Sequence, residues 1–505
     1  MAAATPMPGE AGKAVVANII DGQPVILPSA ANFPVVSAQT QEVLHYGQTV
    51  TPELAIQAVD SAAAAFQRWK QTPVHERRRL LLRAAELFES RVDEVSTRQR
   101  QETSGGEDWA RFTAMQTSGF CREVAGAVAS AVVGDIQPSY FGYTHLVFKE
   151  PVGPVLLIAP WNAAVVLSVR GIANALAAGC TVILKASELC PRTHQLVVQT
   201  FLDAGFPPGT INMITADRPA AAEITETVIA HRALRKIEFI GSAAVGRIIG
   251  SLAARHLKPV FMELGDQSPA IVLDDADLEH AARLVAKGVV MHHGQSCFAT
   301  ERIIVQASVR EEFSRLLLEA LPQAGSPGTA VCRAHVDRAK ATIERAVEGG
   351  ARFLYGSSEL VSSASLAPSV LVDVPLDSTL STEEAFAPTA FLVTVDTDEE
   401  AIAEANSRTG GLSASVFTGS YERGLSMSRE LEFGMVQINN MTMFAERESL
   451  CPLSWRLLLL TDRFGQAAGP ATNFKGSGWG SNNGRYGIDN FLYHKAVSLV
   501  PTKQT

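Results

Sequence analysis

The sequence predicts an α/β protein whose centre is a doubly wound parallel sheet. From Phe141 onward, short apolar runs alternate with amphipathic stretches of helical length, which is the pattern of repeated strand and helix units. The chain of 505 residues is too long for one hydrophobic core, so two or three domains are expected. Hydrophobic residues make up 47% and charged residues 19%, which indicates a large buried interior rather than a disordered chain.

The part of the chain before Phe141 is predicted to be an irregular arm followed by helices. Residues 1–45 show no sustained periodicity. In the stretch AAELFESRVDEV, at 84–95, apolar residues recur at helical spacing. Three helical segments are therefore expected, at 53–70, 74–103 and 107–131.

Two series of strands and helices follow. The first has strands at 153–160, 181–187, 211–215 and 236–241, with helices near 165–178, 190–204, 219–231 and 244–256. The second has a strand at 259–265, a strand at 271–273, a helix at 277–291, a strand at 301–306, helices at 310–320 and 336–349, and strands at 413–419 and 434–439. Parallel strands joined by helices place a ligand crevice at their carboxyl ends. We place a domain boundary near residue 260, to within about ten residues.

Composition narrows the classes of partner. The net charge is −9, and Lys and Arg are scattered, so no nucleic-acid partner is expected. The N-terminus lacks a basic region followed by an apolar core, and the run Leu450 to Leu460 is about half a membrane span. We therefore expect a cytoplasmic protein without a membrane partner. Six cysteines without a CxxC pair predict neither a metal site nor a disulfide framework.

Polar residues follow the first two predicted strands at the expected crevice. Asn162 ends the first strand, where its amide could donate to an oxyanion; the alternative is a turn-forming asparagine. Lys185 and Glu188 end the next strand and could bind the hydroxyl groups of a ribose, although exposed charges of this kind are commoner. Each of these signals is weak by itself.

A glycine-containing turn, Gly241 to Gly246, opens a helix after a strand. It reads GxxxxG, but Arg247 and Ile248 replace the Lys and the Ser or Thr of a P-loop, which disfavours ATP. The dinucleotide signature GxGxxG is also missing. The turn either presents its amides to a pyrophosphate or is a tight turn without a ligand.

Cys297 lies between a helix-like run and a β-branched run, in the stretch HHGQSCFATERIIV. A buried, small, unreactive cysteine is the ordinary interpretation. Glu263 follows an apolar strand and could act as a general base toward water while Cys297 acts as a nucleophile. The ordered combination of strand-end Asn, Lys with Glu, Glu-Leu-Gly and Gly-Gln-Ser-Cys favours the reactive interpretation.

With these motifs the chain resembles the aldehyde dehydrogenase superfamily, from about residue 50 to 448 and again from 473 to 497. The matching segments are PWN at 160–162, LKASE at 184–188, FIGSAAVG at 239–246, MELG at 262–265, GQSC at 294–297 and EEAFAP at 383–388. The resemblance implies an α/β fold of that family. Its parts are an NAD(P)-binding domain at 1–140 and 150–260, a catalytic domain at 261–448, and a small β oligomerisation arm with the C-terminal segment at 141–149 and 473–505.

The resemblance also implies a role for each matched site residue. Cys297 is the nucleophile, Glu263 the base that activates the deacylating water, and Asn162 the oxyanion donor together with the Cys297 backbone N–H. No metal is implied. The implied cofactor contacts are Trp161, Lys185, Glu188, Gly241, Ser242, Val245, Leu264, Glu384 and Phe386.

Within that cofactor set the resemblance assigns positions along the dinucleotide. Lys185 and Glu188 fall on the adenosine ribose, Ser242 on the pyrophosphate, and Glu384 with Phe386 on the nicotinamide end. The Glu188 carboxylate would face the extra 2′-phosphate of NADP, and like charges repel. NAD is therefore the expected cofactor, with NADP as the alternative.

The implied function is NAD(P)-dependent oxidation of an aldehyde to its carboxylic acid through a cysteine thiohemiacetal and a thioester. The run at 161–194 is most similar to the branch that oxidises salicylaldehyde, vanillin and related aromatic aldehydes, and a step in aromatic or polyketide-derived metabolite biosynthesis is one setting for it. Arg170 and Phe298 are candidate substrate contacts, although Arg170 could equally be a packing arginine. A cofactor-independent cysteine hydrolase or thioesterase, using His292 or His293, is the rival reading.

Three features remain. Ala387 replaces the glycine usual in the family after Phe386, and residues 449–470 form an atypical apolar insertion without helical or alternating pattern. The insertion is either a lid over the substrate tunnel or translated intron sequence that could impair catalysis; we favour the second, because exposed apolar loops promote aggregation. The resemblance also places strand 141–149 beside 493–499 as an arm that pairs between subunits, which predicts a homodimer or homotetramer.

Overall fold

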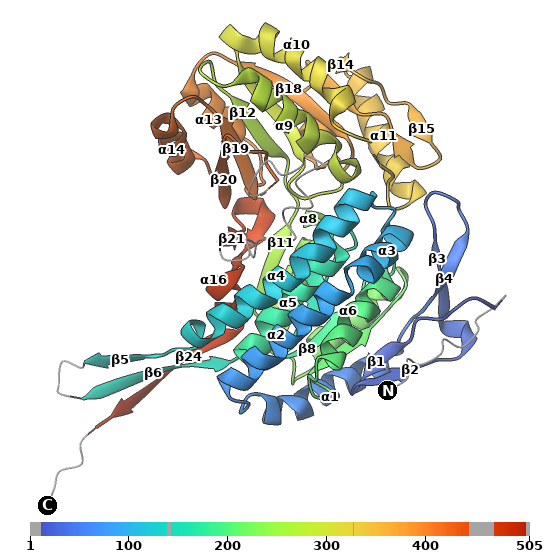
Figure 1. The fold of residues 1–505 in the computed structure, drawn as a ribbon, viewed down its shortest axis with the longest axis vertical. Coiled ribbons are helices and arrows are strands. Elements are labelled where there is room, and N and C mark those ends of the chain that lie inside the picture. Colours follow the sequence, from blue (N-terminus) through green and yellow to red (C-terminus); the bar gives the residue numbers. More distant parts are fainter. Residues whose placement is uncertain (1–11, 139–142, 327, 444–468, 501–505) are drawn as a thin grey trace, which may run out of the picture.

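The computed structural model describes residues 12–138, 143–326, 328–443 and 469–500, which form two lobes and a projecting arm (Figure 1). The larger lobe contains an eight-stranded sheet in the order β2-β1-β9-β8-β7-β10-β11-β22. Its parallel centre consists of β7 (Pro154–Ile158), β8 (Thr181–Lys185), β9 (Ile211–Ile214), β10 (Lys236–Gly241) and β11 (Val260–Leu264). Its antiparallel edge strands are β1 (Asn18–Ile20), β2 (Gln23–Val25) and β22 (Gly478–Trp479).

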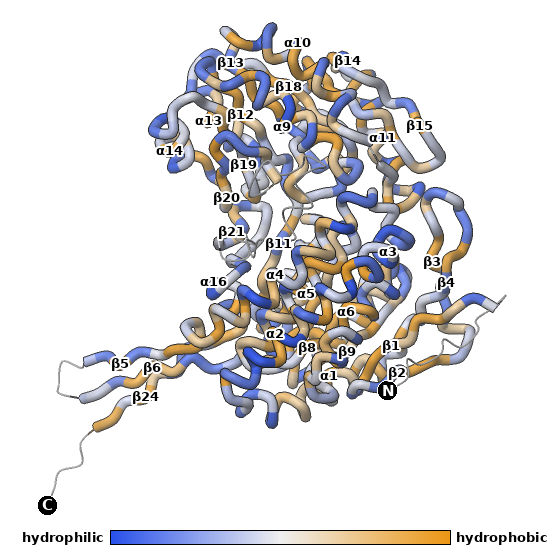
Figure 2. The backbone as a smooth tube through the Cα atoms, viewed as in Figure 1, coloured by the Kyte–Doolittle hydropathy of each residue, from blue (hydrophilic) through white to orange (hydrophobic). Residues whose placement is uncertain are grey.

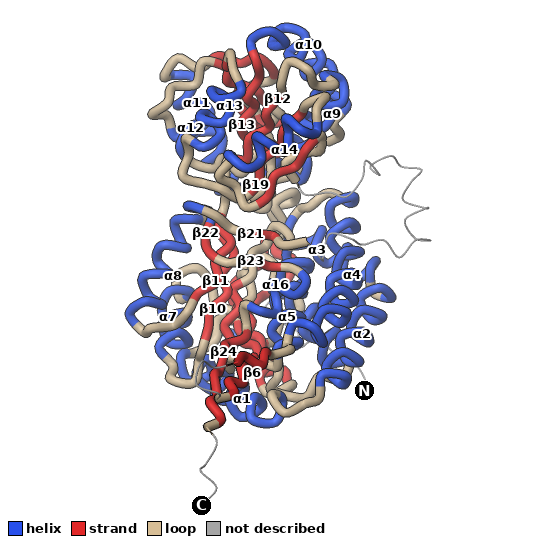
Figure 3. Tube along the Cα trace, turned by 90° about the vertical axis from the view of Figure 1, so that its left-hand side faces the viewer, coloured by secondary structure: helices blue, strands red, loops and turns tan. Residues whose placement is uncertain are grey.

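The central strands are continuous apolar runs because helices cover both faces of the sheet. All residues of β8 and β9 are buried, and a parallel strand enclosed in this way has no polar face. One face is covered by α1 (Pro52–Trp69), α7 (Ala221–Ala230) and α8 (Ala243–Arg255). The other is covered by α2 (Val74–Ser90), α4 (Glu107–Ala131), α5 (Ala164–Ala178) and α6 (Pro191–Asp203), with α3 (Val92–Thr103) beside them. Figure 3 shows the sheet between these layers.

The smaller lobe has a seven-stranded sheet in the order β14-β17-β18-β13-β12-β19-β20. Its strands are β12 (Ser268–Val272), β13 (Thr300–Gln306), β14 (Arg352–Tyr355), β17 (Ser369–Val372), β18 (Thr389–Val395), β19 (Ser413–Phe417) and β20 (Met435–Ile438). The helices around it are α9 (Leu278–Val290), α10 (Arg310–Ala320), α11 (Arg333–Glu348), α12 (Thr379–Thr382), α13 (Asp398–Asn406) and α14 (Tyr421–Glu430). A short ribbon is made of β15 (Leu360–Ser362) and β16 (Ser365–Leu366).

The arm is a three-stranded antiparallel sheet in the order β24-β6-β5. It consists of β5 (Asp135–Pro138), β6 (Thr144–Pro151) and β24 (Leu492–Leu499), and it projects from the larger lobe (Figure 1). Apolar segments gather in the strands and inner helices of both lobes, and they also occur along the arm (Figure 2). The segment before β24 contains β21 (Ala471–Thr472), β23 (Ser481–Asn482) and α16 (Gly484–Asp489). Helix α16 packs on α4 and α5 of the larger lobe, whereas Ala471 of β21 packs with Leu412 and Met435 of the smaller lobe.

The fold corrects four expectations from the sequence. Residues 1–45 are not an irregular arm in their described part, because β1 pairs with β9, and a hairpin forms from β3 (Asn32–Val36) and β4 (Val43–Gln48). The expected helix 74–103 is two helices, separated at Arg91, whose φ of −107° and ψ of 11° leave the helical region. The β1–β9 pairing joins residues that are distant in sequence, and the Arg91 side chain at the helix break contacts Thr200 and Asp203 of α6.

The other two corrections concern boundaries. The strand at 259–265 does not begin the second series, because β11 pairs in parallel with β10 and so completes the first sheet. The arm begins at Asp135 rather than at 141. Within the predicted segment 473–505, the strand that joins the arm is β24. The remaining strands and helices expected at 153–256 are confirmed in order.

Some expectations concern residues that the structure does not describe. Residues 444–468, which include most of the insertion 449–470, are among these. Across the described ranges, no helix is both long enough and apolar enough to cross a membrane. The same ranges contain no group of three His, Cys, Asp or Glu side chains that could hold a metal ion.

Candidate active site

The carboxyl ends of β7, β8 and β10 meet where the strand order of the larger sheet reverses. From β7 the chain proceeds to β8 and β9 on one side, and to β10 and β11 on the other. Such a reversal leaves a crevice between β7 and β10, the strands on either side of the reversal. Doubly wound sheets bind their ligands in such a crevice. Asn162 follows β7 and Ser242 follows β10, so both lie beside this crevice.

Asn162 is held in a defined orientation by two hydrogen bonds. Its backbone carbonyl accepts a hydrogen bond from the indole Nε1 of Trp109, at 2.9 Å. Its side-chain Nδ2 donates to the backbone carbonyl of Gln295, at 3.1 Å. Asn162 is 6% exposed. The amide therefore lies against the loop that carries Cys297, with a second N–H that this bond does not use.

The loop before Cys297 is fixed by the residues of the GQSC motif. Gly294 has a φ of +65°, and a Cβ there would overlap the carbonyl oxygen of Ala387, so a close approach and a left-handed backbone both require glycine. Gln295 is fully buried; its Nε2 donates to the carbonyls of His292 and Thr329, both at 3.1 Å, and its Oε1 accepts from Val331 N at 2.8 Å. The loop is therefore anchored on both sides.

The Cys297 side chain is half-buried and lies among carboxylates. Burial raises the pKa of its thiol, and the charges of Glu263 and Glu384 raise it further. The charge of Arg170 acts in the opposite direction. The thiol is therefore protonated at rest, and its reaction as a thiolate requires a proton acceptor or a nearby positive charge.

Glu263 is the fourth residue of β11 and is 2% exposed. Its Oε2 accepts a hydrogen bond from Arg170 Nη2 on α5, in an ion pair enclosed on both sides. Arg170 was a candidate substrate contact by its sequence position. The structure instead gives it a protein partner, the predicted base, which sequence reasoning missed.

The N-terminus of α8 forms the open side of the crevice. Ser242 caps this helix, with its Oγ accepting from Val245 N at 3.4 Å, and both residues are exposed. Gly246 allows α8 to approach β11, because a Cβ there would lie 2.7 Å from Leu264 Cδ2. The free N–H groups of such a helix end can receive a pyrophosphate. Gly241, the turn residue before Ser242, is half-buried.

Lys185 and Glu188 lie at the end of β8, as the sequence predicts. Lys185 is 8% exposed, and burial lowers the pKa of its amine, while the charge of Glu188 opposes that shift. Glu188 is half-buried in the turn that follows the strand. The two side chains thus form a partly desolvated pair at the crevice, where hydrogen bonds to a ribose are worth more than on an open surface.

The residues 384–386 approach the crevice from the smaller lobe. The Glu384 carboxylate lies directly against Gly265, where a Cβ would overlap it, and its Oε1 has no hydrogen-bond partner among the described residues. Phe386 packs edge-on against Trp161, with ring centroids 5.7 Å apart. Phe386 has a φ of +51°, a conformation that needs external support.

Glu301 supplies that support and was not found from the sequence. Its Oε2 accepts from Ala385 N at 2.9 Å, and its Oε1 accepts from Phe386 N at 3.0 Å. The residue follows Thr300 at the start of β13, so its role depends on a contact that spans more than eighty residues. No motif marks it in the sequence.

Comparison with known families matches residues 26–451 to the aldehyde dehydrogenase family. The chain belongs to this family. A vanillin dehydrogenase of Pseudomonas sp. (strain HR199 / DSM 7063) is 36% identical over 95% of this chain and 97% of that protein. A salicylaldehyde dehydrogenase of Pseudomonas sp. (strain C18) is 32% identical over 92% of this chain and 94% of that protein.

A solved structure agrees with these relatives. The crystal structure of a salicylaldehyde dehydrogenase from Pseudomonas putida G7, complexed with salicylaldehyde, matches with a TM-score of 0.89 at 30% identity, covering 97% of this chain and 99% of that chain. This aldehyde dehydrogenase is therefore an NAD(P)-dependent oxidoreductase that converts aldehydes to carboxylic acids. The family resemblance and the α/β fold predicted from the sequence are confirmed.

His292, one of the two histidines before Cys297, does not form a catalytic dyad with that cysteine in the described part of the dehydrogenase. His292 stacks on Trp109, with ring centroids 4.6 Å apart and ring planes inclined by 11°. Burial lowers its pKa to about 3, so the ring is neutral. Hydrogen bonds between described side chains do not connect Cys297 with His292. The hypothesis of a cofactor-independent cysteine hydrolase is therefore not supported by the position of His292.

Apolar side chains of the dehydrogenase pack around the Cys297 loop in two clusters. One cluster is Trp109, Ala163, Val166, Met441 and Met443, with Phe112, Phe120, Leu167, Leu284, Met291 and Phe298 packed against it. A smaller cluster of Leu412, Met435 and Ala471 contacts Cys297 and Phe298. Phe298, predicted as a substrate contact, thus joins both clusters next to the thiol.

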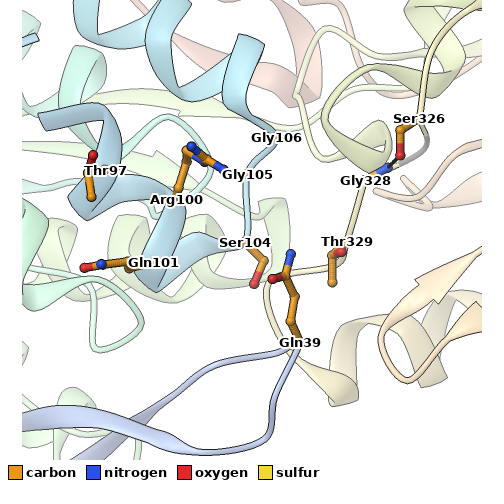
Figure 4. A pocket seen from close by; sticks show the side chains of 10 residues that line it. All are labelled: Gln39, Thr97, Arg100, Gln101, Ser104, Gly105, Gly106, Ser326, Gly328 and Thr329. Atoms are coloured by element: carbon orange, nitrogen blue, oxygen red, sulfur yellow. Dashed lines mark hydrogen bonds between the residues drawn. The ribbon is translucent and has the colours of Figure 1, made fainter. Parts of the chain in front are cut away.

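A separate polar cavity of about 490 Å³ lies where the N-terminal hairpin and the α3–α4 junction meet Ser326, Gly328 and Thr329 (Figure 4). Gln39, Arg100 and Ser104 line it, together with Thr329. Its lining does not include Cys297, Glu263 or Asn162. This cavity is therefore distinct from the predicted catalytic site of the dehydrogenase.

Proposed function

We propose that this dehydrogenase oxidises aromatic aldehydes, with Cys297 as nucleophile, Asn162 as oxyanion donor and Glu263 as the base for deacylation. The observation that carries the proposal is the meeting of three elements: the anchored Cys297 loop, the Asn162 amide bonded to that loop, and the buried Glu263 carboxylate. These groups lie beside the aromatic cluster around Phe298.

The side chains of the crevice fit a nicotinamide dinucleotide. The Ser242 end of α8 is open to a pyrophosphate, Lys185 and Glu188 offer a donor and an acceptor to a ribose, and Glu384 has a carboxylate oxygen without a partner among the described residues. When bound, the oxidised nicotinamide supplies the hydride acceptor and a positive charge. Trp161 and Phe386 present aromatic edges where that end would lie.

The first half of the reaction is carried by Cys297 and Asn162. The Cys297 thiol first loses its proton to solvent water. The resulting thiolate forms a bond to the aldehyde carbon, and the carbonyl π electrons move to the oxygen to give an oxyanion. The free N–H of the Asn162 amide and the backbone N–H of Cys297 hold that oxyanion. Loss of hydride from the same carbon leaves a thioester on Cys297.

The second half depends on Glu263. Its carboxylate takes a proton from water, whose oxygen attacks the thioester carbon. The carbon–sulfur bond then breaks, the carboxylic acid leaves, and Cys297 is restored. Glu263 Oε1 has no hydrogen-bond partner in the described part of the chain, so one carboxylate oxygen is available for this water.

The proposed substrate class follows from the apolar lining. Trp109, Phe112 and Phe298 place aromatic surface next to the thiol, and aromatic rings stack or pack edge-on with a gain beyond simple burial. Two relatives are named for vanillin and salicylaldehyde, which are aromatic aldehydes. Arg170 is assigned to Glu263 and not to a substrate anion. A role in aromatic or polyketide-derived metabolite biosynthesis would use the same substrate class.

We expect a panel of aromatic and aliphatic aldehydes, assayed with both nucleotides, to show higher kcat/KM for benzaldehyde-type substrates and for NAD. Glu188 carries the nucleotide preference, because its half-buried carboxylate would repel a 2′-phosphate. The measurement is the appearance of reduced nicotinamide. Glu188→Gln should reduce the ratio of kcat/KM with NAD to kcat/KM with NADP. Glu226→Gln, an exposed control on α7, should not change this ratio. A higher kcat/KM with NADP than with NAD would overturn the nucleotide assignment.

We also propose that the arm pairs with a second subunit. All four residues of β5 are exposed, with Ile136 exposed by 75%, and an edge strand of this kind is a liability unless it is covered. Light scattering at micromolar concentration should therefore give at least twice the 53.9 kDa mass of one chain. Ile136→Asp should shift the mass toward one chain. A wild-type monomer would contradict this proposal.

A further inference from the structure

Glu238 is a buried carboxylate for which the proposed reaction has no use. It lies on β10 and is 2% exposed. Glu238 pairs in register with Phe261 of β11, so Glu263, two residues further along β11, projects from the same face of the sheet. That face is covered by α5, where a Cβ on Gly171 would lie 3.0 Å from Glu238 Oε1.

Arg170, the neighbour of Gly171 in α5, lies near both carboxylates. It forms the buried ion pair with Glu263, and its charge lowers the pKa of Glu238 against the larger effect of burial. Arg170 Nε, Glu238 Oε2 and Glu263 Oε1 have no hydrogen-bond partners among the described residues. Within the described part of the chain, Arg170 therefore pairs with Glu263, while its charge acts on Glu238 without an ion pair, and one oxygen of each carboxylate has no partner.

Other charged and polar groups around Glu238 also act on its carboxylate. On β10 itself, Lys236 adds a positive charge and donates to the Asn490 carbonyl. From the C-terminal segment, Asn482 also lowers the pKa of Glu238. On the remaining side, β7 presents the uncharged Leu157 in register with Glu238. The charges that act on it are therefore Arg170, Lys236 and Glu263.

We propose that Glu238 is a positioning residue for deacylation, because its charge, on the same face of the sheet, offsets that of Arg170 beside Glu263 and so keeps Glu263 basic enough to activate water. The inference rests on the proposed role of Glu263. A guanidinium that belonged to Glu263 alone would stabilise the ionised carboxylate and weaken it as a base. A second carboxylate divides that charge and restores the basicity.

The sign of the pH dependence follows from this arrangement. Burial raises the pKa of Glu238 to about 7, so the side chain gains its charge as the pH rises through neutrality. Below this pH, Arg170 acts on Glu263 alone and the base is weaker. Above it, the second negative charge makes Glu263 a stronger base, and hydrolysis of the thioester is faster.

The test is the pH profile of thioester hydrolysis, read directly from the protein. Enzyme with excess NAD is mixed with one equivalent of benzaldehyde, quenched in acid, and the acyl adduct on Cys297 is followed by intact mass. In Glu238→Gln, the decay rate of the adduct should fall off on the acid side at a pH about one unit lower than in the wild type. A shift of this size is expected when a negative charge about 8 Å from the Glu263 carboxylate is removed. The decay on the plateau should be a few-fold slower because the base is weaker.

Controls separate this inference from the assignments beneath it. Glu226→Gln makes the same chemical change at an exposed site and should keep the wild-type profile. If Glu238→Gln folds and its profile matches wild type, the inference is wrong. If that variant does not fold, the wild-type enzyme still tests the inference. Its rate of adduct decay must show an inflection near neutral pH, and a profile without one overturns the inference. An adduct that decays at the wild-type rate in Glu263→Gln would instead refute the role of Glu263.

Discussion

Replacing Cys297 by Ala should reduce aldehyde oxidation by on the order of 10⁴-fold or more, while NAD(P) still binds. Without the sulfur no thiohemiacetal forms, so the hydride has no activated carbon to leave. The proposed dinucleotide contacts come from the larger lobe and from residues 384–386, which the substitution does not touch. Oxidation is measured by the appearance of reduced nicotinamide, and binding by calorimetric titration.

A second half-buried cysteine provides the matched control. Cys332 precedes α11 and lies outside the groups assigned to the reaction. Cys332→Ala should therefore keep the wild-type kcat. Substantial NAD(P)-dependent turnover by Cys297→Ala would show that another nucleophile carries the reaction.

Glu263→Gln should form the thioester at a near-normal rate and then lower steady-state turnover by about 10²- to 10⁴-fold, the usual contribution of a general base. Glutamine keeps the shape of the side chain and can still accept the hydrogen bond from Arg170, but it cannot take a proton from water. Rapid mixing should show a burst of one equivalent of reduced nicotinamide per site, followed by a slow phase.

The size of the burst distinguishes the two halves of the reaction. A full burst with a slow second phase assigns Glu263 to deacylation. Loss of the burst itself would mean that Glu263 is needed before hydride leaves, for example to deprotonate Cys297. Wild-type turnover in both phases would remove Glu263 from the mechanism. Glu226→Gln, on the exposed face of α7, is expected to behave as wild type.

Part of the site could be predicted from the sequence because its residues follow buried parallel strands. Lys185 is the last residue of β8, Asn162 and Ser242 lie shortly after β7 and β10, and the carboxyl ends of such strands meet at one edge. The apolar runs of these strands are visible because both faces of the sheet are covered. Gly294 and Gln295 were visible as a motif, and the structure supplies their physical reasons.

Other features could not be predicted because their partners are distant in sequence. The short strand β1 has meaning only as a neighbour of β9, and β11 looks like the start of a new series until its register with β10 is known. Glu301 reads as an ordinary strand residue, although it holds the backbone of residues 385–386.

By itself, the sequence determined the α/β class, the order of the strands and helices at 153–256, and the family, because these depend on local periodicity and on short motifs. The tertiary structure alone decided that Arg170 pairs with Glu263 rather than facing an open tunnel, and that Glu238 lies beside them. These three charges come from α5, β11 and β10. Their interaction depends on the packing of a helix on two adjacent strands, and no spacing within the chain encodes that distance directly.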